Sequence, residues 1–363
     1  MAEYEQRSNV VADPTPDRTV SMGNGKPLLI SDGDEDKPIV VLLHGAGGTH
    51  SHMTDPGPAV GISYDYNSPF PADRAIGWRS YPGFGIWSFQ LDSIKDVTGW
   101  RPVLWRAGFP TATYDQVSNS ALLQPAVDEL VDVVRTLNKE MPGPKLVFLT
   151  HSRGGLLIRK FIKDRCNTPD LVGRIAYVIT LHGPHQGSEL ANVAVDLKNA
   201  IDAVIAAVPA SAGALGWLDG QVSSPAYQEL RVGGPFITGL ANGEPQLPAV
   251  EYHTFGGTSV ELTRITAWVY TFDSAIPMWH LPPFFHKITM IEIPGLSPIL
   301  NSLPPLTEEI TEGEGDMLVA DSRSKLSWGV GQSNQINHAE ALWDPNLQAQ
   351  VLQILGVGIN VWL

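Results

Sequence analysis

Strand, turn and helix follow one another without a gap in Lys145-Leu-Val-Phe-Leu-Thr-His151-Ser152-Arg153-Gly154-Gly155-Leu156-Leu157-Ile158. The first apolar run is typical of a buried strand, and the second has the spacing of a helix. The turn between them must be sharp, and Gly154 and Gly155 provide the small side chains that a close approach of strand and helix requires. This order predicts a nucleophile elbow, in which Ser152 projects above a sheet and backbone N–H groups point at a reacting carbonyl.

Further buried elements are predicted on both sides of this segment. Pro38–Leu43, Pro102–Arg106 and Gly173–Leu181 are apolar runs that we interpret as strands. Apolar residues at helical spacing predict a helix over Gln124–Lys139, which Pro142-Gly143 ends. Smaller expected elements are a short edge strand, a late strand with a glycine turn and a final helix, over Pro27–Ser31, Val250–Ser259 and Leu347–Leu355. Strands that alternate with helices predict an α/β fold, with a mostly parallel sheet and helices on both faces.

The chain is expected to form one domain with two insertions. Residues 1–24 are polar and rich in proline and aspartate, so we expect an extended N-terminal segment there. Residues 25–363 are expected to form a single domain. The alternation of strands and helices is interrupted by a broadly apolar predicted helix over Glu189–Pro209 and by the proline-rich, apolar segment Ile276–Leu306. We therefore expect insertions at about 189–245 and 273–306.

Composition excludes several classes of partner. The net charge is −14 and the sequence has no run of Lys or Arg, which argues against nucleic acid or an anionic membrane surface. Cys166 is the one cysteine, so no intramolecular disulfide can form. The N-terminus lacks the apolar core of a signal peptide, and no stretch is long and apolar enough to span a membrane. We expect a soluble, cytoplasmic protein, although a secreted form with its signal removed stays open.

A serine nucleophile needs a base, and the base is expected late in the chain. In this layout the order is serine, then an acid, then histidine. Six histidines follow the elbow: His182, His185, His253, His280, His286 and His338. The first two follow a strand beside the elbow and are too early, and His280 and His286 lie in the proline-rich segment. His338, in a polar loop before the final helix, is the predicted base.

Asp316 is the predicted acid. It follows an acidic, glycine-containing loop and precedes an apolar step, and it lies between Ser152 and His338 in the chain. Asp321 is the main alternative, and Glu312 and Glu314 are less suited because they lie in the approach loop.

Two backbone N–H groups are expected to bind the developing oxyanion. The elbow provides the N–H of Arg153, the residue after the nucleophile. The glycine-rich turn His44-Gly45-Ala46-Gly47-Gly48, which follows the first strong strand, is expected to provide the N–H of Ala46. A phosphate-binding loop is the alternative for this turn, but no Lys-Ser/Thr pair follows it and its spacing fits no nucleotide-binding motif.

These motifs resemble those of the α/β-hydrolase superfamily, and within it the bacterial lipases and lipase-like esterases. The resemblance rests on the two turns above, on Gly183-Pro184-His185-Gln186-Gly187-Ser188, which matches a segment that such lipases often carry, and on the Asp316 and His338 pair. It implies hydrolysis of a carboxylic ester: Ser152 attacks, His338 shuttles the proton and Asp316 orients His338. Thr150 in place of the usual small residue, and a cation next to the nucleophile, depart from the pattern.

The resemblance also implies a cap over the site and an apolar substrate. The predicted helix at 189–209 occupies the place of a lid, with a core helix as the alternative, and 276–306 is expected to form a second wall. Both favour a small-molecule or lipid ester as substrate. Arg153 is expected to form a salt bridge to the protein surface, with an anionic group of the substrate as the alternative.

No cofactor or metal is expected, and other functions stay open. Metals stabilise some of these relatives, but Asp344 and His185 have no ligand cluster around them in the sequence. An acyltransferase or an amidase could use the same acyl-enzyme. A non-catalytic binding protein on the same fold is a third possibility. The oligomeric state cannot be inferred from the sequence.

Overall fold

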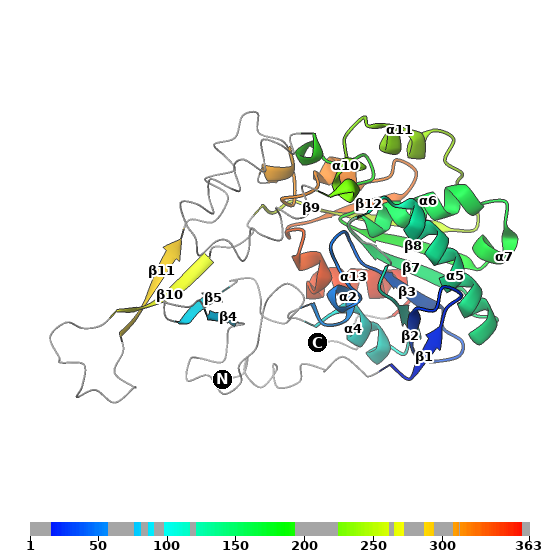
Figure 1. Cartoon of the computed structure of the whole chain (residues 1–363), viewed down its shortest axis with the longest axis horizontal. Helices are drawn as coiled ribbons and strands as arrows, with labels where there is room; N and C mark the ends of the chain where they lie inside the picture. Colours follow the sequence, from blue (N-terminus) through cyan, green and yellow to red (C-terminus); the bar gives the residue numbers. More distant parts are fainter. Residues whose placement is uncertain are drawn as a thin grey trace.

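A computed structural model describes residues 16–56, 98–116, 121–192, 224–260, 308–311 and 313–357, together with the backbone of four further strands. Its main sheet has eight strands in the order β1-β2-β6-β3-β7-β8-β9-β12 (Figure 1). Their bounds are β1 (Arg18–Ser21), β2 (Pro27–Ser31), β6 (Thr111–Thr113), β3 (Ile39–Leu43), β7 (Leu146–His151), β8 (Ile175–Leu181), β9 (Glu251–Gly257) and β12 (Val330–Asn334). From β6 to β12 each strand pairs parallel with its neighbour, whereas the β1–β2 and β2–β6 pairings are antiparallel. The predicted α/β fold with a mostly parallel sheet is confirmed.

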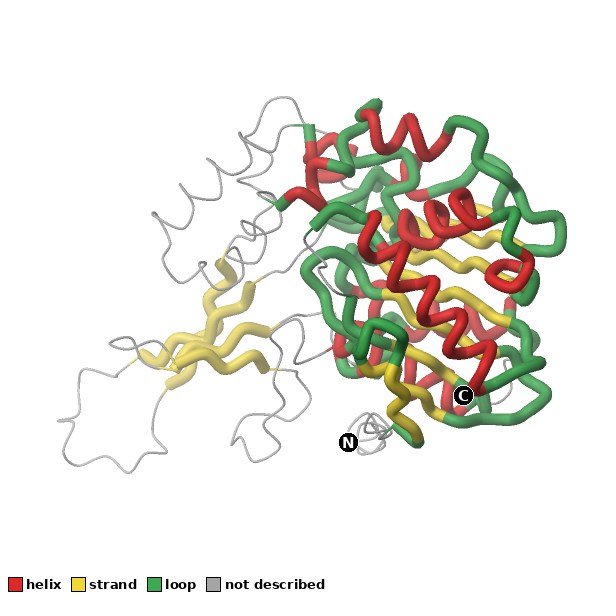
Figure 2. The backbone as a smooth tube through the Cα atoms, turned by 45° about the vertical axis from the view of Figure 1, so that its right-hand side comes forward, coloured by secondary structure: helices red, strands yellow, loops and turns green. Residues whose placement is uncertain are grey.

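Helices cover both faces of this sheet (Figure 2). The longer ones are α4 (Trp100–Arg106), α5 (Gln124–Glu140), α6 (Gly154–Arg165), α11 (Pro235–Ala241) and α13 (Pro345–Ile354). The α-helices of four residues are α2 (Ser51–Thr54), α7 (Pro169–Val172) and α10 (Pro225–Gln228), and the 3₁₀ turns are η1 (Glu189–Ala191), η4 (Glu308–Ile310), η5 (Asp321–Ser324) and η6 (Glu340–Leu342). The helices predicted over Gln124–Lys139 and Leu347–Leu355 are confirmed as α5 and α13.

The central strands are apolar throughout because both of their faces are buried. On β3, Ile39 and Val41 belong to a core cluster that includes residues of α5 and α6. Val40 and Leu42 belong to a second cluster, with residues of α4 and α13. Successive side chains of a strand point to opposite faces, so a doubly covered strand needs apolar residues at every position.

The carboxyl ends of the four central parallel strands are level. The register pairs Leu43 with Thr150 and His151 with Leu181, and Leu181 with Phe255 on the following strand. The turns after β3, β7 and β8 therefore start at one edge of the sheet, which is where ligands bind in open α/β folds.

Two expectations about secondary structure are corrected. Pro102–Arg106 is part of the helix α4 and not a strand. Proline is tolerated in the first turn of a helix, and a short apolar run does not distinguish the two structures. The strand beside β3 is β6, of three residues. β2 is not at the edge of the sheet, because β1 pairs with its outer side. Since β1 spans Arg18–Ser21, part of the expected N-terminal segment is a strand.

The four remaining strands pair antiparallel in a second sheet, in the order β11-β10-β5-β4. They are β4 (Ile76–Ser80), β5 (Ile86–Gln90), β10 (Ile265–Thr271) and β11 (Lys287–Ile293). The strand β11 is the described part of the expected insertion at 273–306. Residues 193–223, which include most of the predicted lid helix, lie outside the described residues, so the lid and the domain division stay predictions. Within the described part of the chain, no helix has the length and hydropathy of a membrane span.

Candidate active site

Ser152 occupies a strained turn between β7 and α6. Its φ angle is 55°, in the left-handed region that residues other than glycine rarely adopt. The backbone holds this conformation on both sides, because the N–H of Ser152 donates to Leu181 O at 2.9 Å and its carbonyl accepts from Gly155 N at 2.9 Å. The strand, turn and helix predicted for this segment are confirmed.

Two glycines let the end of β3 approach this turn. A Cβ atom at Gly45 would lie 2.8 Å from Ser152 Cβ, and one at Gly154 would lie 2.8 Å from Leu43 O. Real Cβ contacts essentially never come that close. Glycine is therefore required at both positions for the His44–Gly48 turn to reach Ser152.

Asp316 and His338 form a buried pair. His338 Nδ1 donates to Asp316 Oδ2 at 2.8 Å, and the backbone N–H of His338 donates to Asp316 O at 3.0 Å. The other carboxylate oxygen, Oδ1, accepts from Leu318 N at 2.9 Å and Val319 N at 2.7 Å. Met317, with φ of 89°, makes the tight turn that these two hydrogen bonds require.

The environment of Asp316 keeps its carboxylate ionised. Burial acts to raise the pKa of Asp316, but the adjacent His338 and the hydrogen bonds from His182 and His338 outweigh it and lower the pKa below its ordinary value. A carboxylate that stays negative can only accept hydrogen bonds, so the Nδ1 atom of His338 must carry a proton.

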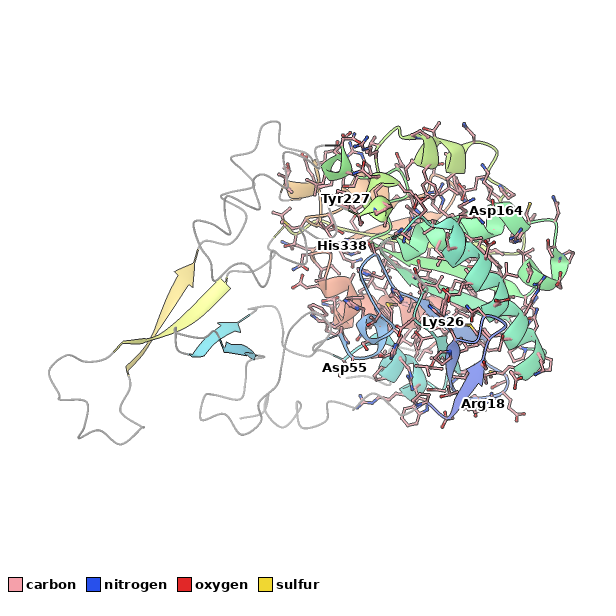
Figure 3. All side chains as sticks on the ribbon, viewed as in Figure 1. Arg18, Lys26, Asp55, Asp164, Tyr227 and His338 are labelled. Atoms are coloured by element: carbon pink, nitrogen blue, oxygen red, sulfur yellow. The ribbon has the colours of Figure 1, made fainter. Side chains whose placement is uncertain are left out.

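His151 links His338 to the elbow. Its Nε2 lies 2.9 Å from His338 O, and the two rings are 4.8 Å apart between centroids. Burial holds the pKa of His151 well below its usual value. The neutral ring therefore donates from Nε2 to the carbonyl of His338. His338 lies at one edge of the main body (Figure 3). Since His151 directly precedes Ser152, this contact brings the predicted base beside the predicted nucleophile.

His182 is a third member of this cluster, which the sequence alone does not predict. His182 Nδ1 lies 2.7 Å from Asp316 Oδ2, and the His182 side chain is fully buried. Its early position in the chain argues against His182 as the base, and the structure places it as a second partner of Asp316. The signal in the sequence is its position directly after β8, which is the parallel neighbour of β7 in the sheet. The carboxyl ends of neighbouring parallel strands lie at the same edge of a sheet.

The ligand atoms of His182, Asp316 and His338 lie within 4.8 Å of one another, a spacing that could hold a metal ion. Both rings instead direct Nδ1 at Asp316 Oδ2 in hydrogen bonds. A metal would have to displace both protons, so the geometry supports a hydrogen-bonded cluster.

His44 orients the peptide between Gly45 and Ala46. Burial lowers the pKa of His44 from 6.5 to about 4, against the opposing effect of its hydrogen bond to Gly45. The neutral ring accepts from Gln116 N at Nε2 (3.4 Å) and donates from Nδ1 to Gly45 O (2.9 Å). Gly48 N also donates to Gly45 O, at 3.3 Å. In a trans peptide the N–H points opposite to the preceding carbonyl, so the Ala46 N–H is directed away from the His44 ring.

Arg153 forms a buried ion pair within the protein. Its Nη2 lies 3.0 Å from Glu229 Oε2 and also donates to Ala121 O. Glu229 in turn accepts from Leu123 N at 2.9 Å. The guanidinium is thus held by the segment after α10. The expected salt bridge forms, but with a partly buried carboxylate rather than one at the protein surface.

Several other candidates have structural partners. Asp321 Oδ2 pairs with Lys325 Nζ at 2.6 Å and accepts from Ser333 Oγ at 2.9 Å. Asp344 caps α13 by accepting from Leu347 N at 2.8 Å. The remaining histidines and acids that the sequence raised have these positions: His185 Nε2 lies 2.7 Å from Thr180 Oγ1, His253 Nε2 lies 3.5 Å from Glu251 Oε2, Glu314 O accepts from Asp321 N, and Glu312, His280 and His286 lie outside the described residues.

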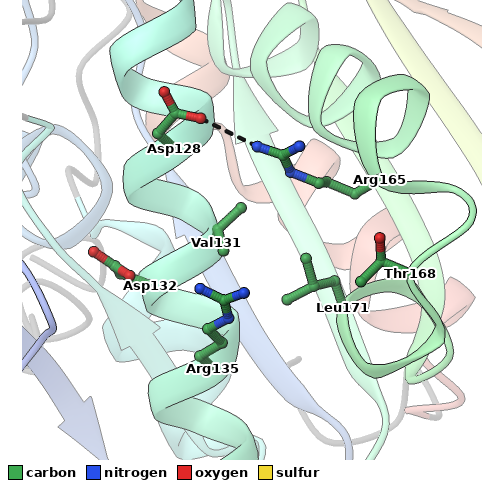
Figure 4. Close-up of a pocket in the computed structure, with 7 residues that line it drawn as sticks. All are labelled: Asp128, Val131, Asp132, Arg135, Arg165, Thr168 and Leu171. Carbon is green, nitrogen blue, oxygen red and sulfur yellow. Dashed lines mark hydrogen bonds and ion pairs between the residues drawn. The ribbon is translucent and has the colours of Figure 1, made fainter.

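A surface pocket lies away from this cluster, on the side of α5, α6 and α7 (Figure 4). Asp128 and Arg165 form an ion pair of 3.2 Å across it, and Val131 and Leu171 are among its apolar lining. It contains none of the predicted site residues.

No family model and no curated protein matches the sequence. Among solved structures, the mature form of lipase BlEst2 from Bacillus licheniformis matches with a TM-score of 0.53 and 18% identity, over 90% of this chain and 97% of that chain. The propeptide form of the same lipase matches with a TM-score of 0.51 and 16% identity, over 91% and 54%. The metagenomic carboxyl esterase MGS0156 gives a TM-score of 0.43 and 16% identity, over 85% and 66%. The expected fold is confirmed: the chain has an α/β-hydrolase fold, and the lipase it is similar to shares that fold.

Proposed function

We propose that this protein is a serine hydrolase that cleaves carboxylic esters through an acyl-enzyme on Ser152. One observation carries the proposal. Ser152 is held at a φ of 55° in the elbow. The Asp316–His338 pair is hydrogen-bonded to His151, the residue before Ser152, through the carbonyl of His338. This arrangement provides a nucleophile, a base and a group that orients the base.

The first half of the reaction forms the acyl-enzyme. His338 uses Nδ1 to bind Asp316, which leaves Nε2 to take the proton of Ser152 Oγ as the oxygen attacks the ester carbonyl. The carbonyl π electrons move onto the oxygen, and the N–H groups of Ala46 and Arg153 are proposed to bind this oxyanion. Support comes from the orientation of the Gly45–Ala46 peptide and from the position of Arg153 at the start of α6, the positive end of a helix.

The second half releases both products. As the tetrahedral intermediate collapses, the bond to the alcohol oxygen breaks and that oxygen takes the proton from His338 Nε2. Water then gives a proton to Nε2 and attacks the acyl carbon of the Ser152 ester. Collapse of this second intermediate releases the acid and returns the proton to Ser152. Asp316 stabilises the imidazolium at each stage without itself being protonated.

The proposed substrate is a small-molecule or lipid ester with an apolar acyl group. Support comes from the broadly apolar sequence at 189–209 and from the apolar, proline-rich sequence at 276–306, which lie in the two expected insertions. Apolar walls with a few polar groups are typical of pockets for such ligands.

Initial rates on p-nitrophenyl esters from acetate to palmitate test the proposal. Ser152→Ala should lower kcat by at least ~10⁴-fold, because the nucleophile is lost while the oxyanion donors remain. Ser322→Ala, which removes a surface hydroxyl bonded to Glu308, is the matched control and should keep its activity. Retention of more than a few per cent of the activity in Ser152→Ala would contradict the proposal.

The same series defines the substrate. A maximum at short acyl chains would indicate an esterase with a confined pocket. Rates that rise toward long chains, and steepen once the substrate forms an interface, would indicate a lipase. Diversion of the acyl group from water to added alcohols or amines would instead indicate acyl transfer on the same serine.

A further inference from the structure

The carboxylate of Asp316 uses all of its hydrogen-bonding capacity. Oδ1 accepts from the backbone N–H groups of Leu318 and Val319. Oδ2 accepts from two imidazoles, at 2.8 Å from His338 Nδ1 and 2.7 Å from His182 Nδ1. A carboxylate offers about four acceptor sites. The predicted base, His338, therefore shares Oδ2 with His182.

Backbone hydrogen bonding and close packing fix the position of His182. Its backbone has a φ of 53°, and its N–H donates to Phe255 O at 2.7 Å. The side chain is 0% exposed, and a Cβ atom at Gly257 would lie 2.4 Å from His182 Cε1. The ring is thus packed against the backbone of β9. The backbone of His182 is in the left-handed region, which residues other than glycine adopt uncommonly.

The surroundings of His182 select one tautomer. Asp316 can only accept, so His182 Nδ1 carries the proton. Nε2 is buried, and among the described residues no hydrogen-bond partner reaches it. A proton on Nε2 would be a buried donor without an acceptor, which is unfavourable. The Nδ1–H tautomer fits, and it makes His182 a neutral donor to Oδ2. An apolar residue would fill the same space without burying an unpaired polar atom.

We propose that His182 is a positioning residue that sets how strongly Asp316 acts on His338. This inference rests on the proposed function, because it concerns the same carboxylate. His182 fixes the direction of Oδ2, and it also shares that oxygen with His338. Sharing reduces the negative charge available to stabilise the imidazolium of His338, since a hydrogen bond to the charged form of Asp316 competes with the one that His338 makes.

The groups that face His338 are few in the described part of the chain. Asp316 and His182 approach one side of the ring, and His151 of the elbow lies against it, with ring centroids 4.8 Å apart. Glu340, in the same loop, accepts from Asn337 N at 2.8 Å. A change at His182 therefore acts on His338 chiefly through Asp316.

Three substitutions at one position separate positioning from packing. His182→Asn keeps a donor near the place of Nδ1, and asparagine tolerates a positive φ. His182→Gly also tolerates that φ but removes the donor. His182→Gln carries its amide nitrogen farther out, near the place of Nε2, and keeps a side chain in the space if the glycine variant does not fold.

The pH dependence of kcat/KM on a p-nitrophenyl ester is the first readout. We expect His182→Gly and His182→Gln to lower the plateau about tenfold, because Oδ2 loses the group that fixes its direction. The acid limb should move to higher pH by roughly half a unit, because Asp316 then acts on His338 alone. His182→Asn should stay within about threefold of the wild type, with the acid limb unmoved. Equal losses in all three variants with no movement of the limb would reduce His182 to a packing role and overturn the inference.

The low-field proton NMR resonances of the imidazole N–H groups give a readout that needs no ester turnover. We expect two such resonances in the wild type and the loss of both in Asp316→Asn. His182→Gly should remove one and shift the other, and His182→Asn should leave the second where it was. A His338 resonance that does not respond to His182→Gly would contradict the inference. If the wild type hydrolyses no ester, the proposed function fails, and these spectra still decide whether His182 acts on His338 through Asp316.

Discussion

The same dipeptide, His-Gly, follows two strands that flank the elbow strand, and its histidine has a different partner in each place. His44 follows β3 and His182 follows β8, on either side of β7. Both side chains are buried. The His44 ring turns back onto its own chain and binds Gly45 O, whereas the His182 ring reaches across to Asp316.

The next strand in the sheet explains the difference. β3 lies beside β6, and Gln116, three residues after β6, donates to Nε2 of His44 and so fixes its tautomer. β8 lies beside β9, where Gly257 leaves room for the His182 ring to pass toward Asp316. The sequence motif is the same, but the neighbouring strand decides whether the histidine orients a peptide or a carboxylate.

Asp316→Asn tests the partner that distinguishes the two turns, and it should have the largest effect. An asparagine has one accepting oxygen, so its NH₂ group must face either the imidazoles or the backbone N–H groups of Leu318 and Val319. An NH₂ group that faces His338 favours the wrong tautomer of that ring. We expect kcat on a p-nitrophenyl ester to fall by roughly 10³–10⁴-fold. Asp321→Asn, at the alternative acid, is the control and should stay within about threefold, because Asp321 pairs with Lys325 instead.

A double-mutant cycle sharpens the same comparison. In the Asp316→Asn background, His182→Gly should add little, because the carboxylate that it acts through is already lost. His44→Ala should still lower kcat by its full factor, since His44 contacts the other turn. Full additivity of Asp316→Asn with His182→Gly would contradict the assignment of His182 to Asp316.

The buried histidines should make stability depend on pH. The pKa of His44 is lowered from 6.5 to about 4, so between these values the unfolded chain binds a proton that the folded protein does not. The free energy of unfolding should therefore fall as the pH drops from about 6.5 to about 4, by about 3 kcal/mol from His44 alone. The lowered pKa of His151 acts in the same direction. The lowered pKa of Asp316 adds stability that is lost only below about pH 4.

Urea unfolding at about pH 7, 5.5 and 4 measures this dependence. His44→Asn keeps a donor to Gly45 O but cannot take up a proton, so it should flatten the profile. A wild-type free energy of unfolding that stays constant or rises as the pH is lowered from about 7 to about 4 would contradict the buried, neutral state of His44.

His44→Ala should have a smaller effect on activity than Asp316→Asn, and an effect of a different kind from that of His182→Gly. Loss of the hydrogen bond to Gly45 O frees the Gly45–Ala46 peptide to rotate. We expect kcat to fall by about 10–100-fold, less than for removal of an oxyanion donor itself, with the acid limb of the pH profile unmoved. His44→Asn should recover most of the loss. Movement of the acid limb in His44→Ala would show that the two turns are not separate in function.

Much of the fold could be predicted because periodicity records burial. β3, β7 and β8 are buried on both faces, and their unbroken apolar runs identify them. The run at Pro102–Arg106 is also largely apolar but is too short to distinguish a strand from a helix, so the strand predicted there is wrong. β12, with the sequence Val-Gly-Gln-Ser-Asn, is mostly polar and partly exposed, and it carries no strand pattern at all.

Chain order alone predicts the three candidate catalytic residues of the site. The order of Ser152, Asp316 and His338 predicts a triad, and the structure brings Asp316 and His338 together. The contacts of His182 and Gln116 could not be predicted, because each depends on which strands are neighbours in the sheet. Neighbouring strands bring together residues that are far apart in the chain, and the periodicity of one strand does not record its partner.

Labelling with a fluorophosphonate probe, followed by peptide mass spectrometry, tests the central claim most directly. If Asp316 and His338 activate Ser152, the probe should modify Ser152 alone, and the rate of labelling should fall by at least ~10²-fold in Asp316→Asn. Labelling of another serine, no labelling of the folded wild type, or an unchanged rate in Asp316→Asn would contradict the claim.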